Sequence, residues 1–148
     1  MNIRLAEKTD IDELVEFNQA MAFETEGKRL DTDVLRPGVA AVFEDEHKGF
    51  YVVAVVDDVI AGGLLVTFEW SDWRNKWFWW IQSVYIKPDY RGRSIYRLMY
   101  EFVKSRSDQQ GNVCGFRLYV EHDNEHAQRV YEKVGMHRSH YLAYEEEK

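Results

Sequence analysis

The sequence has one cysteine, no long apolar run and no cluster of potential zinc ligands. Cys114 cannot form a disulfide within the chain, and no group of cysteines and histidines has the spacing of a zinc site. No apolar run approaches the roughly 20 residues of a membrane-spanning helix. The N-terminal stretch also lacks the apolar core of a secretory signal. These absences favour a cytoplasmic protein with no structural metal and no membrane contact.

The sequence also has fewer basic than acidic residues. The chain has 19 Lys and Arg residues against 26 Asp and Glu residues, which gives a formal net charge of −7. A nucleic-acid-binding surface needs a basic footprint, so the composition argues against DNA or RNA as a partner. Acidic groups that line a cleft would favour a cationic small molecule, although acidic groups spread over the surface serve solubility equally well.

Linkers, internal repeats and low-complexity segments are missing as well, and 148 residues is an ordinary length for one domain. Apolar residues at strand or helix spacing predict the order β-α-α-β-β-β-α-β-α-β. The expected strands lie at 3–5, 50–56, 59–70, 77–86, 113–120 and 139–145, and the expected helices at 10–21, from 37, 95–103 and 127–134. Residues 23–31 have no periodicity and are expected to form a loop. We therefore expect one mixed α/β domain over residues 1–148.

All five tryptophans lie in the stretch WSDWRNKWFWW, between residues 70 and 80. Side chains alternate along a strand, so Trp77 and Trp79 face one side of the sheet, while Phe78 and Trp80 face the other. One pair is expected to pack beneath helices and the other to contact a substrate or a partner, but alternation does not say which. Because aromatic residues are enriched at protein interfaces, the hairpin could also form the interface of a homodimer.

A strand, a polar turn and an amphipathic helix follow one another in VYIKPDYRGRSIYRLMYEF, residues 84–102. The first N–H groups of a helix lack internal partners and carry partial positive charge, so such a turn is a natural anion site. Arg91 and Arg93 add two guanidinium groups that suit phosphate. The same pattern also fits an ordinary surface turn.

A second segment, LYVEHDNEHAQRVYEKVGMH at residues 118–137, combines a strand, Asn124, Ala127, Tyr131 and Gly135. Together the two segments resemble the GNAT family of acyl-CoA-dependent N-acetyltransferases. The first is similar to that family's pyrophosphate loop, V-x-P-x-Y-R-G-x-G-x-G. The second is similar to its L-x-V-x-x-x-N-x-x-A-x-x-x-Y-x-K-x-G-F segment, with Met136 in place of phenylalanine. The order of elements also matches, so the resemblance covers nearly the whole chain.

The resemblance implies a single GNAT-like domain of the α+β type, with a mixed central sheet of about six to seven strands and about four helices. It also implies acetyl-CoA as the cofactor. The cofactor-binding residues it points to are Val84, Tyr85, Ile86, Arg91, Gly92, Arg93, Ser94, Ile95, Tyr96 and Asn124. For Asn124 the resemblance indicates a hydrogen bond to the pantetheine arm, but a cap on the last helix fits equally well.

The pyrophosphate loop is degenerate, because Ser94 and Tyr96 stand where the family has glycines that allow close approach to the phosphates. The Ser94 hydroxyl can donate to a phosphate oxygen or cap the helix. The larger Tyr96 side chain has to point away, stack on the cofactor or obstruct it. A second hypothesis follows, in which the chain is a degenerate member that acts as an acyl-CoA sensor or an interaction module.

The mechanism implied by the resemblance is direct attack of a neutral amine on the acetyl thioester. Tyr131 falls on the family's general acid, although its spacing also fits a core residue. A tyrosine of pKa near 10 gives a proton to a thiolate of pKa near 8.5 only with help from the site. Many relatives have a basic glutamate near Gln82, and glutamine can only order a water that relays the proton. Glu24, Glu26 and Glu69 remain candidates, so the base is unassigned.

The hairpin most resembles the spermidine/spermine and thialysine acetyltransferase branch, with Trp73 on that branch's tryptophan. The branch's acidic pair is replaced by Gln82 and Ser83, which removes the strongest reason to expect a polyamine. Aromatic rings still hold a cation at about 0.5–2 kcal/mol per contact. The expected acceptor is a primary amine of a polyamine-like or amino acid-like small molecule, or an exposed peptide amine. The expected acceptor contacts are Glu24, Glu26, Trp73 and Trp80.

Overall fold

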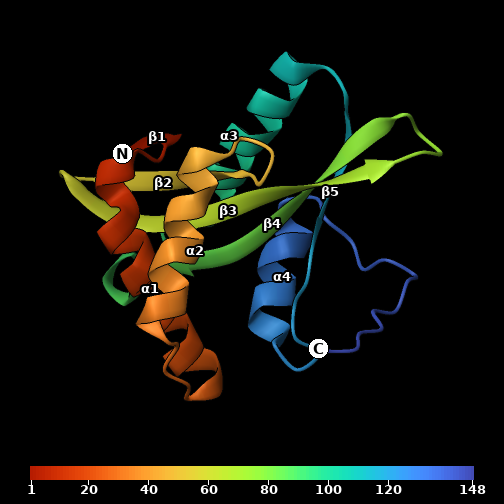
Figure 1. Cartoon of the computed structure of the whole chain (residues 1–148). Helices are drawn as coiled ribbons and strands as arrows, with labels where there is room; N and C mark the ends of the chain where they lie inside the picture. The colour runs from red at the N-terminus through yellow and green to blue at the C-terminus, as the bar shows by residue number, and fades with distance from the viewer.

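A five-stranded sheet in the order β1-β2-β3-β4-β5 organises the computed structural model, which describes residues 1–148 (Figure 1). The strands are β1 (Asn2–Leu5), β2 (Phe50–Val56), β3 (Val59–Ser71), β4 (Lys76–Ile86) and β5 (Val113–Leu118). The first four are antiparallel neighbours, and β5 lies parallel to β4. The predicted α+β fold with a mixed sheet is therefore confirmed, although with five strands.

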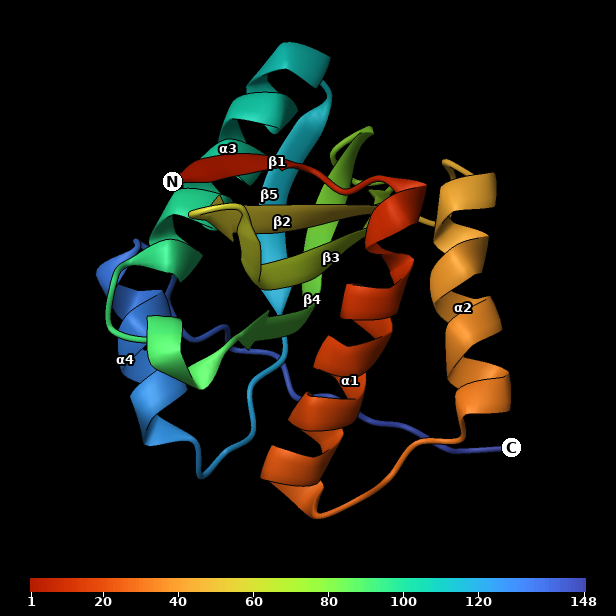
Figure 2. The same ribbon diagram turned by 90° about the vertical axis from the view of Figure 1, so that its left-hand side faces the viewer.

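Helices cover both faces of this sheet. They are α1 (Ile11–Glu26), α2 (Thr32–Glu44), α3 (Ile95–Gln110) and α4 (Glu125–Lys133), with short 3-10 turns η1 (Lys8–Asp10) and η2 (Pro88–Tyr90). Figure 2 shows α1 and α2 on one side of the sheet and α3 and α4 on the other. None of the helices is both long and apolar enough to cross a membrane.

Each helical layer packs on its own hydrophobic cluster, because strand side chains alternate between the two faces. Between the sheet and α3, the fully buried side chains include Val52, Leu64, Trp79, Ile95 and Met99, and Val130 and Tyr131 of α4 pack against the same cluster. Between the sheet and α1 with α2, the buried side chains include Leu14, Phe17, Val39, Tyr51 and Val53.

The tryptophan stretch forms the end of the β3–β4 hairpin and the first half of β4. Trp79 is 2% exposed in the α3-side cluster, and Trp77 packs against that cluster. Trp80 points to the opposite face, where its indole Nε1 bonds Glu69. The alternation predicted from sequence is thus correct, and the core pair is Trp77 and Trp79. Trp73 lies in the turn between the strands and is 88% exposed.

The strand predicted at 139–145 is wrong, which is one reason why the sheet has five strands and not six to seven. No residue of the segment belongs to a strand, and its Tyr141 amide instead donates to the Ser139 hydroxyl. A strand is stable when its backbone pairs and one of its faces is buried. Tyr141, Leu142 and Tyr144 are 63%, 83% and 92% exposed, so no apolar burial offsets the cost of ordering this segment.

The predicted loop at 23–31 is shorter than expected, because α1 continues to Glu26 and ends at Gly27 in the left-handed region, with φ of +63°. Glu24 and Glu26 therefore lie on the last turn of a helix. The second helix starts at Thr32 and not near Pro37, since the Asp31 side chain accepts a hydrogen bond from the Asp33 amide and caps it.

Candidate active site

The parallel pair of β4 and the edge strand β5 ends partway along β4. Pairing between β4 and β5 runs from Trp77 and Val113 to Ile81 and Leu118 and stops there, while β4 continues to Ile86. A bulge accompanies the separation, because the register between β3 and β4 shifts at Gly63/Leu65 and Ser83 adopts a φ of +52°. The edge of β4 that includes the predicted Val84 and Ile86 is therefore left without a strand partner on the β5 side.

The turn between η2 and α3 presents backbone donors that have no acceptor. The amides from Gly92 through Arg97 donate no hydrogen bond, and the first bond of the helix runs from the Leu98 amide to the Ser94 carbonyl. Gly92 and Ser94 both have left-handed backbones, with φ of +79° and +62°. Successive free N–H groups at a helix start form an anion site, which fits the phosphates of a coenzyme A thioester.

Arg91 is held by groups of the protein. Its Nη2 lies 2.8 Å from Glu24 Oε2, and its Nε donates to the Ile86 carbonyl oxygen at 2.8 Å. Tyr85 Oη donates to the other Glu24 oxygen at 3.0 Å. Burial, followed by this bond to Glu24, raises the pKa of Tyr85. An expected acceptor contact and two expected cofactor contacts thus form one network that ties α1 to the end of β4.

The Tyr96 side chain points away from the turn and into the core. The residue is 5% exposed, its ring stacks on Tyr100 with centroids 6.0 Å apart, and it meets Tyr131 edge-on at 5.2 Å. Of the three orientations expected from sequence, the structure has the one that leaves the turn unobstructed. The Tyr96 hydroxyl is buried without a hydrogen-bond partner.

Tyr131 lies on α4 and is half-buried against the α3-side cluster. Burial raises the pKa of its hydroxyl above the ordinary value of 10, which makes the phenol a weaker acid, so transfer of its proton to a thiolate still requires help from the site. The two readings left open from sequence are compatible, because the ring belongs to the core while the hydroxyl has no hydrogen-bond partner. An available, protonated phenol is what a general acid requires.

Asn124 is the N-cap of α4, and its Oδ1 accepts a hydrogen bond from the Ala127 amide at 3.1 Å. The capping role left open from sequence is therefore present. The Nδ2 group makes no hydrogen bond, so the cap does not exclude a second contact to a ligand.

A polar and aromatic cluster covers the sheet on the face opposite α3. Glu69 accepts from Trp80 Nε1 at 2.7 Å and from Arg117 Nη1 at 3.1 Å. The Trp80 ring lies 4.6 Å from that of Tyr119. Gln82 on the same strand donates through Nε2 to the Thr67 hydroxyl, which leaves its Oε1 free. The predicted Trp80 and Gln82 are thus on one surface.

Sequence reasoning missed Arg117 and Tyr119 in this cluster. Their spacing on one strand does put them on a common face. However, their place beside Trp80 depends on the β4–β5 register, in which Trp80 is opposite Arg117, and no local pattern encodes that register. The Arg117 guanidinium also lies 3.6 Å from the centre of the Phe78 ring.

The four expected acceptor contacts do not form one site. Trp73 lies in the hairpin turn next to Lys76, whereas Glu24 bonds Tyr85 near the other end of β4. At about 3.3 Å per residue, the stretch from Lys76 to Tyr85 spans roughly 30 Å. Glu26 is exposed, and its only ion pair is a long one of 3.9 Å to Lys28.

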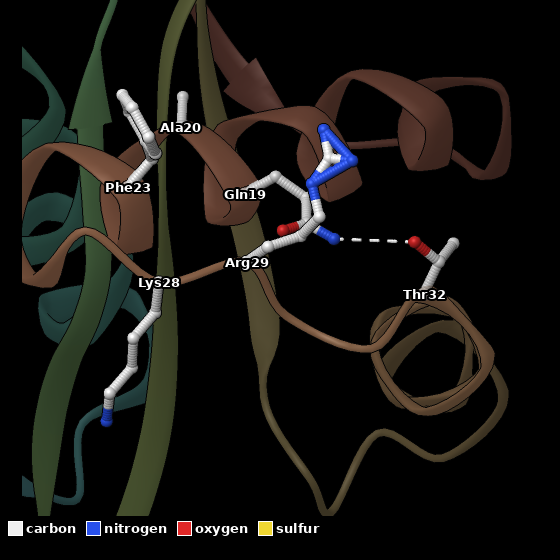
Figure 3. Close-up of a pocket in the computed structure, with 6 residues that line it drawn as sticks. All are labelled: Gln19, Ala20, Phe23, Lys28, Arg29 and Thr32. Atoms are coloured by element: carbon white, nitrogen blue, oxygen red, sulfur yellow. Dashed lines mark hydrogen bonds between the residues drawn. The ribbon is translucent and has the colours of Figure 1, made fainter.

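A hollow of about 400 Å³ lies beside the end of α1, at a place that sequence reasoning did not predict (Figure 3). Gln19 shapes it by bonding the backbone N and O of Leu30, each at 2.8 Å. The lining residues are Gln19, Ala20, Phe23, Lys28, Arg29 and Thr32. None of the expected catalytic, cofactor or acceptor residues belongs to this lining.

Residues 11–136 match the family model described as Acetyltransferase (GNAT) family. A possible acetyltransferase from Clostridium difficile 630 is 44% identical, with a TM-score of 0.91 over 99% of this chain and 97% of that chain. A predicted acetyltransferase with acetyl-CoA from Clostridium acetobutylicum is 20% identical, with a TM-score of 0.78 over 97% of this chain and 95% of that chain. No curated protein gives a significant match.

The chain therefore belongs to the GNAT family of acetyltransferases, as the two motifs predicted. As a member of this family, the chain is an acetyl-CoA-dependent enzyme. The cofactor expected from sequence, acetyl-CoA, is thus confirmed by family membership. The Clostridium acetobutylicum protein is too distant in sequence to support more than the shared fold.

Proposed function

We propose that this acetyltransferase transfers the acetyl group of acetyl-CoA to a primary amine by direct attack, with Tyr131 as the general acid. The observation that carries the proposal is the Tyr131 hydroxyl on α4, which makes no hydrogen bond within the protein while its ring packs against the α3-side cluster. Tyr131 belongs to α4 and the phosphate-type turn to the start of α3, and the contact of Tyr131 with Tyr96 joins the two.

The residues proposed to hold the cofactor fall into two groups. The free amides of Gly92 through Arg97 suit the pyrophosphate, and Arg93, which has no ion pair, adds a positive charge. The unpaired edge of β4 at Val84 and Ile86, with the Asn124 amide group, suits the amides of the pantetheine arm. When bound, acetyl-CoA supplies the activated acetyl thioester.

The proton transfers follow from the chemistry of the reaction. The neutral amine nitrogen bonds to the acetyl carbon, and the carbon–sulfur bond breaks. Tyr131 donates its proton to the leaving sulfur, so that coenzyme A leaves as the thiol. The amine loses one proton, which we assign to a water held by the free Oε1 of Gln82, because Gln82 accepts hydrogen bonds but is no base.

For the acceptor we propose a primary amine of a polyamine-like or amino acid-like small molecule, or an exposed peptide amine. The rings of Trp80 and Tyr119 offer an aromatic wall for a cationic or apolar stem. Arg117 already neutralises Glu69, and Arg91 neutralises Glu24, so neither carboxylate is left as a bare site for a second ammonium group. The aromatic residues of the β3–β4 hairpin are the feature that supports a relationship between this enzyme and the spermidine/spermine and thialysine acetyltransferase branch.

The test is release of coenzyme A from acetyl-CoA with spermidine, lysine and a peptide that has a free N-terminus. We expect release with at least one of these amines. In Trp80→Leu the KM for that amine should rise severalfold while the Kd for acetyl-CoA stays the same. Trp73→Leu, at the exposed turn, is the matched control and should behave as the wild type. No release with any amine, despite acetyl-CoA binding, would contradict the proposal.

A further inference from the structure

Arg117 on β5 has a guanidinium group that the protein uses only in part. Its Nη1 bonds both oxygens of Glu69, at 3.1 and 3.3 Å, and the side chain makes no other hydrogen bond. The side chain is 29% exposed, and none of its nitrogens is among the buried polar atoms that lack a partner. The N–H groups of Nε and Nη2 therefore face solvent and are free to donate to a ligand.

The surroundings of Arg117 hold this guanidinium in place. It lies 3.6 Å from the centre of the ring of Phe78, which is buried. Glu69, which holds Nη1, is itself fixed by the bond from Trp80 Nε1 at 2.7 Å. An ordered side chain loses little further freedom when it binds a ligand, so such a group binds at low entropic cost. A fixed guanidinium edge with free N–H groups matches the two oxygens of a carboxylate.

The charge around Arg117 favours an anion, although the whole chain has a net charge of −7. Residues 69–80 together with Arg117 have three basic and two acidic side chains, namely Arg74, Lys76, Arg117, Glu69 and Asp72. Arg74 lies 5.0 Å from the same Phe78 ring, and its only hydrogen bond is to a serine hydroxyl. A carboxylate bound to Arg117 thus meets the charge of Glu69 but also a surplus of positive charge that offsets the repulsion.

The distance along β4 sets the length of a ligand that reaches both Arg117 and the reacting acetyl group. Gln82, to which we assign the water that takes the amine proton, is on the same face of β4 as Trp80 and Phe78. Arg117 is opposite Trp80 in the β4–β5 register, and its guanidinium lies over Phe78. At about 3.3 Å per residue, the guanidinium is roughly 7–13 Å from Gln82. A ligand that spans this distance needs several carbons between its amine and its carboxylate, and the rings of Trp80 and Tyr119 lie beside its path.

We infer that Arg117 determines acceptor specificity by binding a carboxylate, so that the acceptor is a linear amino acid whose reacting amine lies several carbons from its acid group. The inference rests on the proposed function, because it concerns the acceptor of the same acetyl transfer. It selects the amino acid-like acceptor from the three kinds proposed above. Polyamines are disfavoured because they place a second cation beside Arg117, and a peptide N-terminus is disfavoured because uncharged peptide groups follow its amine.

The test compares two acceptors that differ only in the terminal carboxylate, ε-aminocaproate and n-pentylamine. With acetyl-CoA, the kcat/KM for coenzyme A release should be at least about ten-fold higher for ε-aminocaproate. In Arg117→Gln this advantage should fall to about two-fold or less, because only the carboxylate-bearing acceptor loses a partner. Both acceptors are measured on one preparation, so partial unfolding of the variant lowers both values and leaves their ratio unchanged.

Three controls separate carboxylate binding from charge, packing and acceptor length. Arg117→Lys keeps the charge but not the planar fork and should give an intermediate ratio. Arg106→Gln is the matched control, because Arg106 on α3 also lies over an aromatic ring, that of Phe50 at 5.4 Å, and should leave the ratio unchanged. Glycine, whose amine and carboxylate are joined by a single carbon, should be at least about ten-fold poorer than ε-aminocaproate, since it cannot span from Gln82 to Arg117.

Nitrogen-15 NMR of the arginine Nε–H groups gives a readout that does not depend on turnover. The Arg117 signal is the one missing from Arg117→Gln. Saturating ε-aminocaproate, with coenzyme A present, should shift this signal, whereas n-pentylamine should not. An unshifted Arg117 signal would overturn the inference, and so would an equal kcat/KM for the two acceptors or a higher one for spermidine. Failure of the proposed function looks different, because the Arg117 signal would then shift while no amine is acetylated.

Discussion

Two neighbouring residues that depart from the family's glycine pattern have different structural consequences. Tyr96 turns into the core and leaves the phosphate-type turn open. Ser94 keeps the left-handed backbone that a glycine adopts freely, with φ of +62° and no side-chain cap bond. For a residue with a Cβ this conformation costs roughly 1–2 kcal/mol. The turn before α3 therefore keeps its left-handed shape, and the backbone of Ser94 is strained as a result.

Replacing Ser94 with glycine should relieve this strain. Ser94→Gly is expected to raise the free energy of unfolding by roughly 0.5–1 kcal/mol, because the left-handed penalty outweighs the extra freedom of glycine in the unfolded chain. Its Kd for acetyl-CoA should fall or stay unchanged, since a phosphate can approach the bare backbone more closely. Urea unfolding and calorimetric titration give the two values.

Asn75→Gly is the matched control, because Asn75 has a left-handed φ of +54° in the hairpin turn, far from the α3 turn. It should gain stability without any change in the Kd for acetyl-CoA. Weaker acetyl-CoA binding in Ser94→Gly would show that the Ser94 hydroxyl contacts the cofactor, and a loss of stability would contradict the strain argument.

At the scale of elements, the junction between β1 and α1 depends on one buried carboxylate. Asp10 Oδ2 accepts from Arg4 Nη1 at 2.8 Å and from the Glu7 amide at 2.7 Å. Burial alone would raise the pKa of Asp10, but these hydrogen bonds outweigh it and leave the pKa below the ordinary value of 3.8. Asp10 therefore stabilises the fold above about pH 4, and this contribution is lost as the pH falls through the lowered pKa.

Asp10→Asn should destabilise the protein by about 2 kcal/mol at pH 7, since the three hydrogen bonds that the charged carboxylate accepts are weakened or lost. The difference from the wild type should shrink as the pH falls through the lowered pKa of Asp10, where the wild-type carboxylate also becomes protonated. Urea unfolding over this pH range measures both effects. Asp12→Asn, which breaks an exposed pair with Arg36, should change stability little at either pH, and an equal effect of both variants would refute the argument.

The elements themselves were largely predictable from sequence, because each has its own period of apolar residues. The strands from Phe50 to Ile86 have the predicted order and nearly the predicted bounds, and the helix that starts at Ile95 has the predicted start but continues past Val103 to Gln110. The last predicted strand failed because a strand also needs a partner, and SHYLAYE has strand-like composition without one. Apolar spacing predicts which way side chains alternate but not whether another strand lies alongside.

Hydrogen exchange tests whether residues 139–145 form a strand. The amides of residues 139–145 lie outside every strand and should exchange within seconds in the folded protein. Those of Trp79 and Ile81 in the middle of β4 should exchange orders of magnitude more slowly. Protection of residues 139–145 comparable to that of β5 would mean that a sixth strand forms after all.

At the scale of the whole molecule, the candidate site combines segments that are far apart in sequence. The resemblance of two local motifs to the GNAT family pointed to Gly92, Ser94, Asn124 and Tyr131, which belong to the starts of α3 and α4 and to one face of α4. The bond from Arg91 to Glu24 and the position of Arg117 beside Glu69 depend on how distant elements pack. No local pattern in the sequence contains that information, which is why both ion pairs were missed.

The proposed mechanism requires the hydroxyl of Tyr131. In Tyr131→Phe the ring and its packing remain, and only the proton donor is lost. Calorimetry should give a Kd for acetyl-CoA within about two-fold of the wild type, while the rate of coenzyme A release with the accepted amine falls by about 10²–10³-fold. Release at the wild-type rate by Tyr131→Phe would contradict the proposed mechanism directly.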